Sequence, residues 1–306
     1  MTSIFKIVGV VIVVGVLCVA TVALATDFTR DSLLADTSWL APTNWDQDSS
    51  YPQNVNDNAT IEAAGFLCTY DPGSALTINN LALAGDSPTR RKLHIKDAAL
   101  TVDGVATLGD YAELDVDRNL TIDDTDMSGN IWVNVADSTT VDLGTTVDIL
   151  GTAGGSGISC TLHLKDNTTG TFKGATVTID ADTPDVTRGL KFTSSDSTFD
   201  VTVKLVLKSD QTSGTKRAKL WIAAGTINID DGGAGNGILE VDGGDDSLRR
   251  AELDIDDTLS AEETDFESGY ATIDVASGAT ATGGDVVFKV GAIVTKTGPG
   301  KFRSGA

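Results

Sequence analysis

Cysteine, proline, glutamate and aromatic residues are all scarce in this chain. Its 306 residues include 3 Cys and 6 Pro, only 6% are aromatic, and 37 of the 44 acidic residues are Asp. After residue 25 only Cys68 and Cys160 remain, far apart in the sequence, which favours two buried free thiols over one long-range disulfide. No stretch after residue 25 shows a sustained helical period with caps, so a helical architecture is excluded.

Histidine is scarce as well, which bears on catalysis. The two histidines, His94 and His163, each lie in a Leu-His-apolar pattern in which strand alternation turns the ring outward. Neither has a Ser or Cys partner that would make a nucleophile. We therefore expect no enzymatic activity.

Glycine and aspartate are abundant instead, with 32 Gly in the chain. Both are turn residues and poor helix formers, so together with Thr and Val they indicate many short strands joined by tight turns. The formal net charge is −22. A surface this acidic repels nucleic acid and anionic membranes and attracts cations, and it also keeps a protein soluble.

A repeated pattern at residues 90–104 (RRKLHIKDAALTVDG) organises the sequence. It predicts two short strands followed by an Asp-Gly turn, and it returns at residues 216–232 (KRAKLWIAAGTINIDDG) and, degraded, at residues 249–255. The matching positions are Leu93 and Leu220, Ile95 and Ile222, Leu100 and Ile227, Val102 and Ile229, and Asp103 and Asp230. Such a unit cannot bury its apolar face alone, so repetition implies stacking into an all-β parallel β-helix or β-solenoid.

Residues 1–25 have the pattern of a secretory signal peptide. Lys6 supplies a positive charge, residues 7–22 form an apolar run, and residues 23–25 (ALA) fit a small-x-small cleavage site. The run is also long enough to remain as an uncleaved anchor, which is the alternative. Leu17 before Cys18 argues against a lipoprotein signal, which needs a small residue there.

Residues 26–75 differ from the rest of the chain. They hold Trp39 and Trp45, two of the four Trp, and we expect them to form a cap and the entry to the first strands. The run of residues 43–45 (TNW), 51–52 (YP) and 56–61 (NDNATI) resembles the opening of secreted bacterial β-solenoid modules found in autotransporter-like surface proteins. Residues 294–302 (VTKTGPGKF) resemble the autotransporter-associated β-strand repeat.

These resemblances imply a secreted, passenger-like protein with a structural or adhesive role. They cover about a fifth of the chain, and no anchoring segment of that family is recognisable, which leaves the route of attachment open. We expect residues 1–25 to be a signal peptide, residues 26–75 the cap, and residues 76–306 the solenoid. The expected partners are other copies of the chain or cell-surface polysaccharide, and the expected location is extracellular.

Two stretches have features of calcium loops. Residues 115–126 place oxygen ligands at several of the required positions, but Leu120 stands where the sharp turn needs Gly. Residues 232–239 and 243–248 echo a Gly- and Asp-rich calcium repeat, and Asp242, Asp245 and Asp246 are its candidate ligands. Otherwise we expect no cofactor.

Three basic pairs stand out in this acidic chain because each enters a repeat at the same place. They predict either local neutralisation of Asp or a charged stripe that meets an acidic face of another copy, and they are Arg90 and Arg91, Lys216 and Arg217, and Arg249 and Arg250.

The apolar run at residues 286–294 has only Asp285 and Lys289 as charged guards. A strand so lightly guarded is a template for pairing with another chain. We expect Val286, Phe288, Val290 and Ile293 to mediate self-association, and contact between unlike ends of successive copies would build a filament.

Two rival functions stay open. A calcium-dependent carbohydrate-binding module would use the candidate loops above. A β-helix polysaccharide lyase would use Asp254, Asp256 and Asp257 near Arg249 and Arg250, although paired carboxylates need a cleft to separate their pKa values and long loops to build one are missing.

Overall fold

The computed structural model describes residues 26–30, 37–47, 49–62, 67–84, 90–136, 138–149, 160–166, 170–181, 187–209, 216–230, 232 and 237–304. Throughout these ranges the chain is all-β, with one short 3-10 helix, η1 (Pro42–Asn44), and no α-helix. The strands, in chain order, are β1 (Asp27–Arg30), β2 (Asn58–Ile61), β3 (Leu67–Tyr70), β4 (Leu76–Ile78), β5 (Asn80–Leu83), β6 (Arg91–Ile95), β7 (Leu100–Leu108), β8 (Ala112–Val116), β9 (Leu120–Met127), β10 (Asn130–Val135), β11 (Thr140–Asp142), β12 (Thr146–Ile149), β13 (Cys160–Asp166), β14 (Thr171–Asp180), β15 (Thr187–Lys208), β16 (Lys216–Ile229), β17 (Ile238–Asp242), β18 (Arg249–Ile255), β19 (Thr258–Ala261), β20 (Glu263–Val275), β21 (Thr280–Thr282), β22 (Asp285–Phe288), β23 (Ala292–Thr297) and β24 (Lys301–Arg303).

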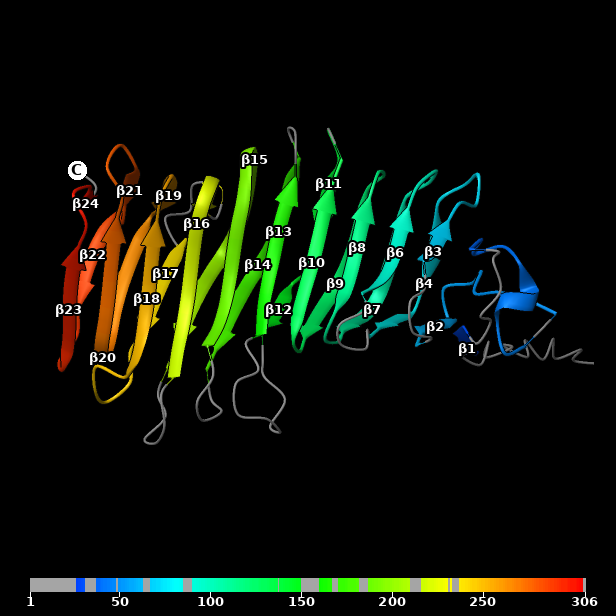
Figure 1. Ribbon diagram of the computed structural model, residues 1–306, viewed down its shortest axis with the longest axis horizontal. Helices are drawn as coiled ribbons and strands as arrows, with labels where there is room; N and C mark the ends of the chain where they lie inside the picture. The colour runs from blue at the N-terminus through cyan, green and yellow to red at the C-terminus, as the bar shows by residue number, and fades with distance from the viewer. Residues whose placement is uncertain are drawn as a thin grey trace, which may run out of the picture.

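The ladders between these strands are parallel. Strand β6 pairs with β8, β8 with β10 and β10 with β13, so each strand lies beside one that comes much later in the sequence. The spacing varies, because Leu114 pairs with Val133 whereas Leu205 pairs with Leu239. Parallel neighbours need long connections, and unequal connections account for the irregular repeat in the sequence. Figure 1 shows the strands stacked side by side along the long axis of the molecule.

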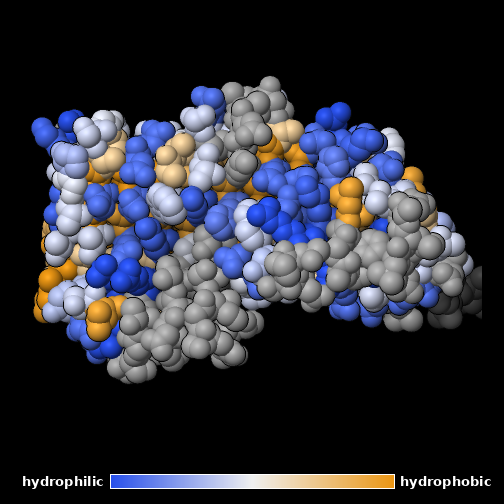
Figure 2. Space-filling view, in the orientation of Figure 1, coloured by the Kyte–Doolittle hydropathy of each residue, from blue (hydrophilic) through white to orange (hydrophobic). Residues whose placement is uncertain are grey.

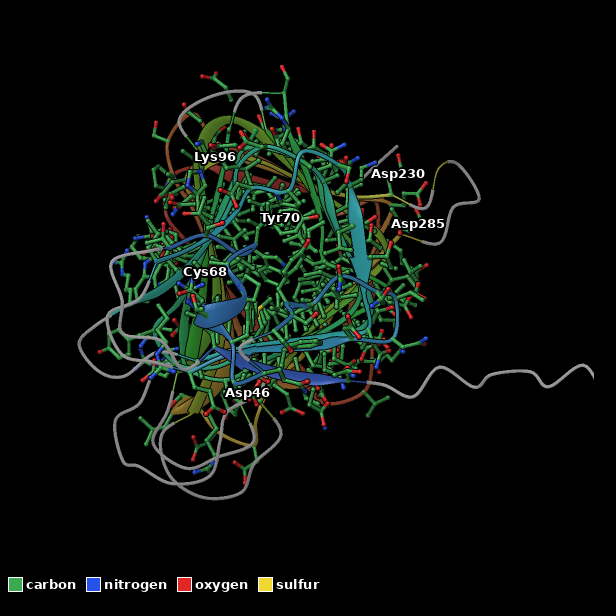
Figure 3. All side chains as sticks on the ribbon, turned by 90° about the vertical axis from the view of Figure 1, so that its right-hand side faces the viewer. Asp46, Cys68, Tyr70, Lys96, Asp230 and Asp285 are labelled. Atoms are coloured by element: carbon green, nitrogen blue, oxygen red, sulfur yellow. The ribbon has the colours of Figure 1, made fainter. Side chains whose placement is uncertain are left out.

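Alternate residues of each strand form a continuous apolar core. In the first repeat Leu93, Ile95, Leu100 and Val102 are all fully buried. Their counterparts Leu220, Ile222, Ile227 and Ile229 are fully buried too, which confirms the predicted alternation. Each such side chain contributes about 1.5–3 kcal/mol when removed from water. Figure 3, viewed from the N-terminal end, shows carbon-rich side chains in the interior and oxygen and nitrogen atoms around the rim.

The predicted turn at Asp103-Gly104 is wrong. Strand β7 runs through it from Leu100 to Leu108, with a shift of register between Val102 and Val105. Gly104 is needed for close approach rather than for a turn, because a Cβ there would collide with the side chain of Asn80. The chain thus bends within β7, at the shift of register, and the strand continues through the bend.

Two later bends share one construction. Thr125 and Thr264 are fully buried, and their hydroxyls donate to the main-chain carbonyls of Leu143 (2.6 Å) and Gly283 (2.8 Å) respectively. Gly144 follows the first of these carbonyls and has φ of 102°, a conformation that disfavours any side chain. A hydroxyl in the core is therefore satisfied by the backbone of the next strand layer.

Residues near the N-terminus pack on the same stack. Trp39 and Trp45 are fully buried, with ring centroids 4.9 Å apart, and Trp39 also lies 5.4 Å from Tyr70. Strands β2 and β3 pair with β5 and β6, so this segment joins the ladders of the following strands. Cys68 is buried, and that burial raises its thiol pKa to about 12, so it is unreactive. The side chain of Cys160 lies outside the described residues.

Candidate functional site

One long sheet, which we call the front sheet, carries ion pairs and aromatic side chains on its outward face. It consists of β3, β6, β8, β10, β13, the first parts of β15 and β16, β18, the last part of β20, and β23. Because the ladders are parallel, outward residues from distant parts of the sequence fall into rows across the strands. Figure 1 shows this sheet toward the viewer, and Figure 2 shows hydrophilic side chains gathered over β8 and β10.

Near its N-terminal end the front sheet sets a basic strand against an acidic one. Arg90, just before β6, pairs with Glu113 of β8 at 3.1 Å. Lys92 pairs with both Glu113 (3.0 Å) and Asp115 (2.6 Å), which raises the pKa of Lys92 against the opposing effect of its partial burial. His94 lies 2.7 Å from Asp117. The two strands are thus joined by their outward side chains as well as by their backbones.

The same arrangement returns between β16 and β18. Arg217 pairs with Glu252 at 3.5 Å and Lys219 with Asp254 at 2.8 Å, while the indole N–H of Trp221 donates to the carboxylate of Asp256 at 3.4 Å. The acidic strands carry nearly the same letters, AELDVD at residues 112–117 and AELDID at residues 251–256. The sequence analysis missed this second repeat, although the shared hexapeptide after each basic strand could have revealed it.

The predicted basic stripe consists largely of residues paired with carboxylates. Arg90, Arg217 and Arg250 each lie beside a carboxylate of the same molecule, and Arg250 reaches Glu252 at 2.7 Å. Arg91 is only 5% exposed, so it does not share the surface with its neighbour. Lys216 is in register with Arg249, but its side chain lies outside the described residues. The observed ion pairs fit local neutralisation, in which exposed pairs add little stability.

Two of the three carboxylates predicted to bind calcium contact an arginine. Arg249 lies 2.5 Å from Asp245 and is also ion-paired with Asp246, while Asp242 accepts a hydrogen bond from Ser268 at 2.6 Å. A calcium ion would have to displace the guanidinium from both partners. Within the described ranges no group of three His, Cys, Asp or Glu residues has the arrangement of a metal site.

In residues 115–126, Asp115 contacts Lys92 and Asp117 contacts His94, each within the front sheet. Residues 233–236 of the other calcium candidate lie outside the described part of the chain.

The carboxylates considered for a lyase already have partners within the same molecule. Asp254 and Asp256 contact Lys219 and Trp221 on the sheet surface, and Asp257 accepts a hydrogen bond from the backbone of Gly225 at 2.7 Å. A cavity of about 290 Å³ lies elsewhere, and its lining includes Thr121, Asp123, Asp142, Lys173 and Thr202.

The middle of the front sheet carries a row of four side chains that the sequence analysis did not bring together. Trp132, His163, Lys191 and Trp221 are in register on the successive strands β10, β13, β15 and β16. The rings of Trp132 and His163 are stacked, 5.2 Å apart and 6° from parallel. Lys191 places its ammonium 3.7 Å from the ring centroid of Trp221. We call these four residues the central row.

Positive charge surrounds the imidazole of this row. Burial is the largest cause that lowers the pKa of His163, and the charges of Lys191 and Arg90 lower it further, to about 4. Arg90 lies over the other tryptophan, with its guanidinium 3.7 Å from the Trp132 ring centroid. His163 is therefore neutral at physiological pH, and the electrostatic potential at its ring is positive.

This pKa predicts a pH effect on stability. As pH falls from about 6.5 toward 4, unfolded His163 takes up a proton that the folded protein does not, so stability falls through this window. We expect His163→Gln to lose less thermal stability than the parent between pH 7 and pH 4.5, measured by circular dichroism. Carboxylates titrate in both proteins, so an equal loss in both would contradict the assignment.

At the C-terminal end, strands β22, β23 and β24 form an exposed edge. Each pairs with β20 or β21 on one side, and among the described residues none has a partner on the other. Phe288 is 61% exposed, Val290 fully exposed and Ile293 47% exposed, whereas Val286 packs partly against the core. Figure 2 shows hydrophobic side chains at this end of the molecule, over β23.

Neither protein-family models, nor curated proteins, nor solved structures give a match to this chain. In the part of the chain that the structure describes, no helix has the length and hydropathy for crossing a membrane.

Proposed function

We propose that this protein is a secreted parallel β-solenoid with a structural or adhesive role at a cell surface. The signal-peptide pattern of residues 1–25 and the resemblance of residues 43–61 and 294–302 to autotransporter-like modules support secretion. The parallel ladders and the apolar core that follows them along the stack support the solenoid. On its charged face, ion pairs join the side chains of neighbouring strands, an arrangement suited to a rigid rod.

The observation that carries this proposal is the exposed edge at β22–β24. Strand edges with apolar side chains pair readily with other chains, and soluble proteins normally block them. Residues 285–304 contain four basic residues and one acidic residue, Asp285, in a chain with net charge −22. A basic edge attracts the acidic remainder of another copy, which favours contact between unlike surfaces and growth into a filament.

At the opposite end of the stack, the outer edge of β1 is already hydrogen-bonded. On the outer side of β1, Asp46 donates its backbone N–H to the Thr29 carbonyl at 2.8 Å, and the Asp46 carboxylate accepts the Thr29 N–H at 3.0 Å. The second copy therefore docks against this surface rather than extending β1 as a ladder.

We expect the change Phe288→Ser together with Val290→Ser to weaken self-association about tenfold or more, because two exposed apolar side chains no longer become buried. Sedimentation velocity over a range of protein concentrations measures this. Val203→Ser, at a position 48% exposed on β15, far from both ends of the stack, is the matched control and leaves association unchanged. Attraction between unlike charges also predicts weaker association at higher salt. A protein that sediments as a monomer at every concentration would contradict self-association.

A further inference from the structure

Among the described side chains, carboxylates are missing from the middle of the front sheet, although the chain has 44 acidic residues. Between the acidic strands β8 and β18 lie β10, β13, β15 and β16. Their outward residues with described side chains include no acid and are Asn130, Trp132, Asn134, His163, Lys191, Thr193, Arg217, Lys219 and Trp221. Among the described residues, acidic side chains thus lie on the two flanks of a neutral-to-basic zone.

Lys191 lies at the centre of this zone and differs from Arg90, Lys92 and Lys219 of the same sheet. Arg90, Lys92 and Lys219 each pair with a carboxylate. No carboxylate of the described residues lies within ion-pair distance of Lys191, whose ammonium rests on the Trp221 ring instead. A cation over an aromatic face keeps its charge available to a further anion.

The lowered pKa of His163 reports the same field, since Lys191 is the largest electrostatic contributor to it. The groups that face the ring across the row are Trp132 on one side and Lys191 on the other, with Arg90 beyond Trp132. None of them is acidic. The central row therefore combines positive potential, an imidazole and two indoles on one partly exposed surface.

We propose that the central row binds an anionic polysaccharide whose chain runs along the stack, with Lys191 receiving a carboxylate or sulfate group of the polymer. Successive strands are about 4.8 Å apart, so the row offers one side chain per step over a length of about 14 Å. Polar edges of Trp132 and His163 supply hydrogen-bond partners beside the ammonium. The inference rests on the proposed function, because a protein at a cell surface is in contact with surface polysaccharides.

The acidic residues on both flanks disfavour densely charged polyanions and favour polymers with widely spaced charges. Double-stranded DNA carries one charge per about 1.7 Å and binds through many phosphate contacts. Such a charge density would meet Glu113 and Asp115 on one flank and Asp254 and Asp256 on the other. Anionic membranes would meet both flanks at once. A polymer with about one acidic group per sugar can place that group at Lys191 and set its neutral parts against the flanks.

The test uses the full secreted protein and polygalacturonate as the probe, with dextran as a neutral polymer, in affinity electrophoresis and calorimetry with a chelator present. We expect retardation by polygalacturonate and not by dextran, with affinity that falls as salt increases. Lys191→Gln should lower the affinity about tenfold, and Lys191→Arg should retain most of it. Lys204→Gln, which removes an equivalent charge paired with Glu240 at 2.5 Å on another sheet, is the matched control and should bind like the parent.

Equal affinities of the Lys191→Gln and Lys204→Gln variants would overturn the proposal. Binding that requires calcium would also overturn it, in favour of a calcium-dependent module, and equal binding of duplex DNA would show a non-specific polyanion surface. Sedimentation of Lys191→Gln should match that of the parent. A failure of glycan binding therefore leaves the proposed self-association to its own test at Phe288 and Val290.

Discussion

Replacement of Leu220 by Asp is expected to unfold the region around β16 and to cost more than about 4 kcal/mol of stability. Leu220 is fully buried, in register with Leu190 and Leu253 on the two neighbouring strands. The change removes a large apolar side chain, a loss of about 2–5 kcal/mol by itself. It also introduces a carboxylate with no partner in the core. Urea unfolding followed by circular dichroism measures the loss.

Thr101→Asp is the matched control for this change. Thr101 lies on the outward side of β7, in register with Thr77 and Thr121, so a carboxylate there meets water and no like charge at the two neighbouring positions of its row. We expect a change of less than about 1 kcal/mol, as for most surface substitutions. Equal losses in the two variants would show that the assignment of inward and outward faces is wrong.

Replacement of Trp39 by Ala is expected to cost about 3–5 kcal/mol, the usual range for a large buried aromatic residue. Trp39 is fully buried between Trp45 and Tyr70, and its indole N–H donates to the Pro52 carbonyl at 2.9 Å. The change leaves a cavity and an unpaired carbonyl at the N-terminal end of the core. Hydrogen exchange should show the loss of protection first in β1 and β3, whose Phe28 and Tyr70 pack against the two tryptophans.

Val55→Ala, in the same segment but at a side chain 47% exposed, should leave both unfolding and exchange close to those of the parent. If Trp39→Ala also had little effect, residues 37–61 would be an appendage rather than a cap for the apolar core. The cap interpretation of residues 26–75 would then fail.

The inward positions could be predicted from the sequence because strand alternation is local. The spacing of two residues between apolar positions predicts a buried face, and the four residues that show it in the two repeats are all buried: Leu93, Ile95, Leu220 and Ile222. The path at Asp103-Gly104 could not be predicted in this way. Gly104 is required because Asn80 of a neighbouring strand approaches it closely. The sequence Asp-Gly is the same whether the glycine permits a close approach or a turn, so the two cases cannot be distinguished from the sequence.

The central row was beyond the sequence analysis for a different reason. Trp132, His163, Lys191 and Trp221 lie on successive strands, but the connections between them differ in length, so no fixed period links the four positions. Their alignment depends on the register of three ladders. The ion pairs between β6 and β8 depend on register too, although the repeated hexapeptide at residues 112–117 and 251–256 offered a signal.

Electron microscopy of the secreted protein is the most direct test of the proposed self-assembling solenoid. We predict rods one molecule wide that join end to end into longer filaments, and that shorten to single rods when Phe288 and Val290 are both replaced by Ser. Compact or separate particles at every protein concentration, indistinguishable between the parent and this variant, would contradict the account.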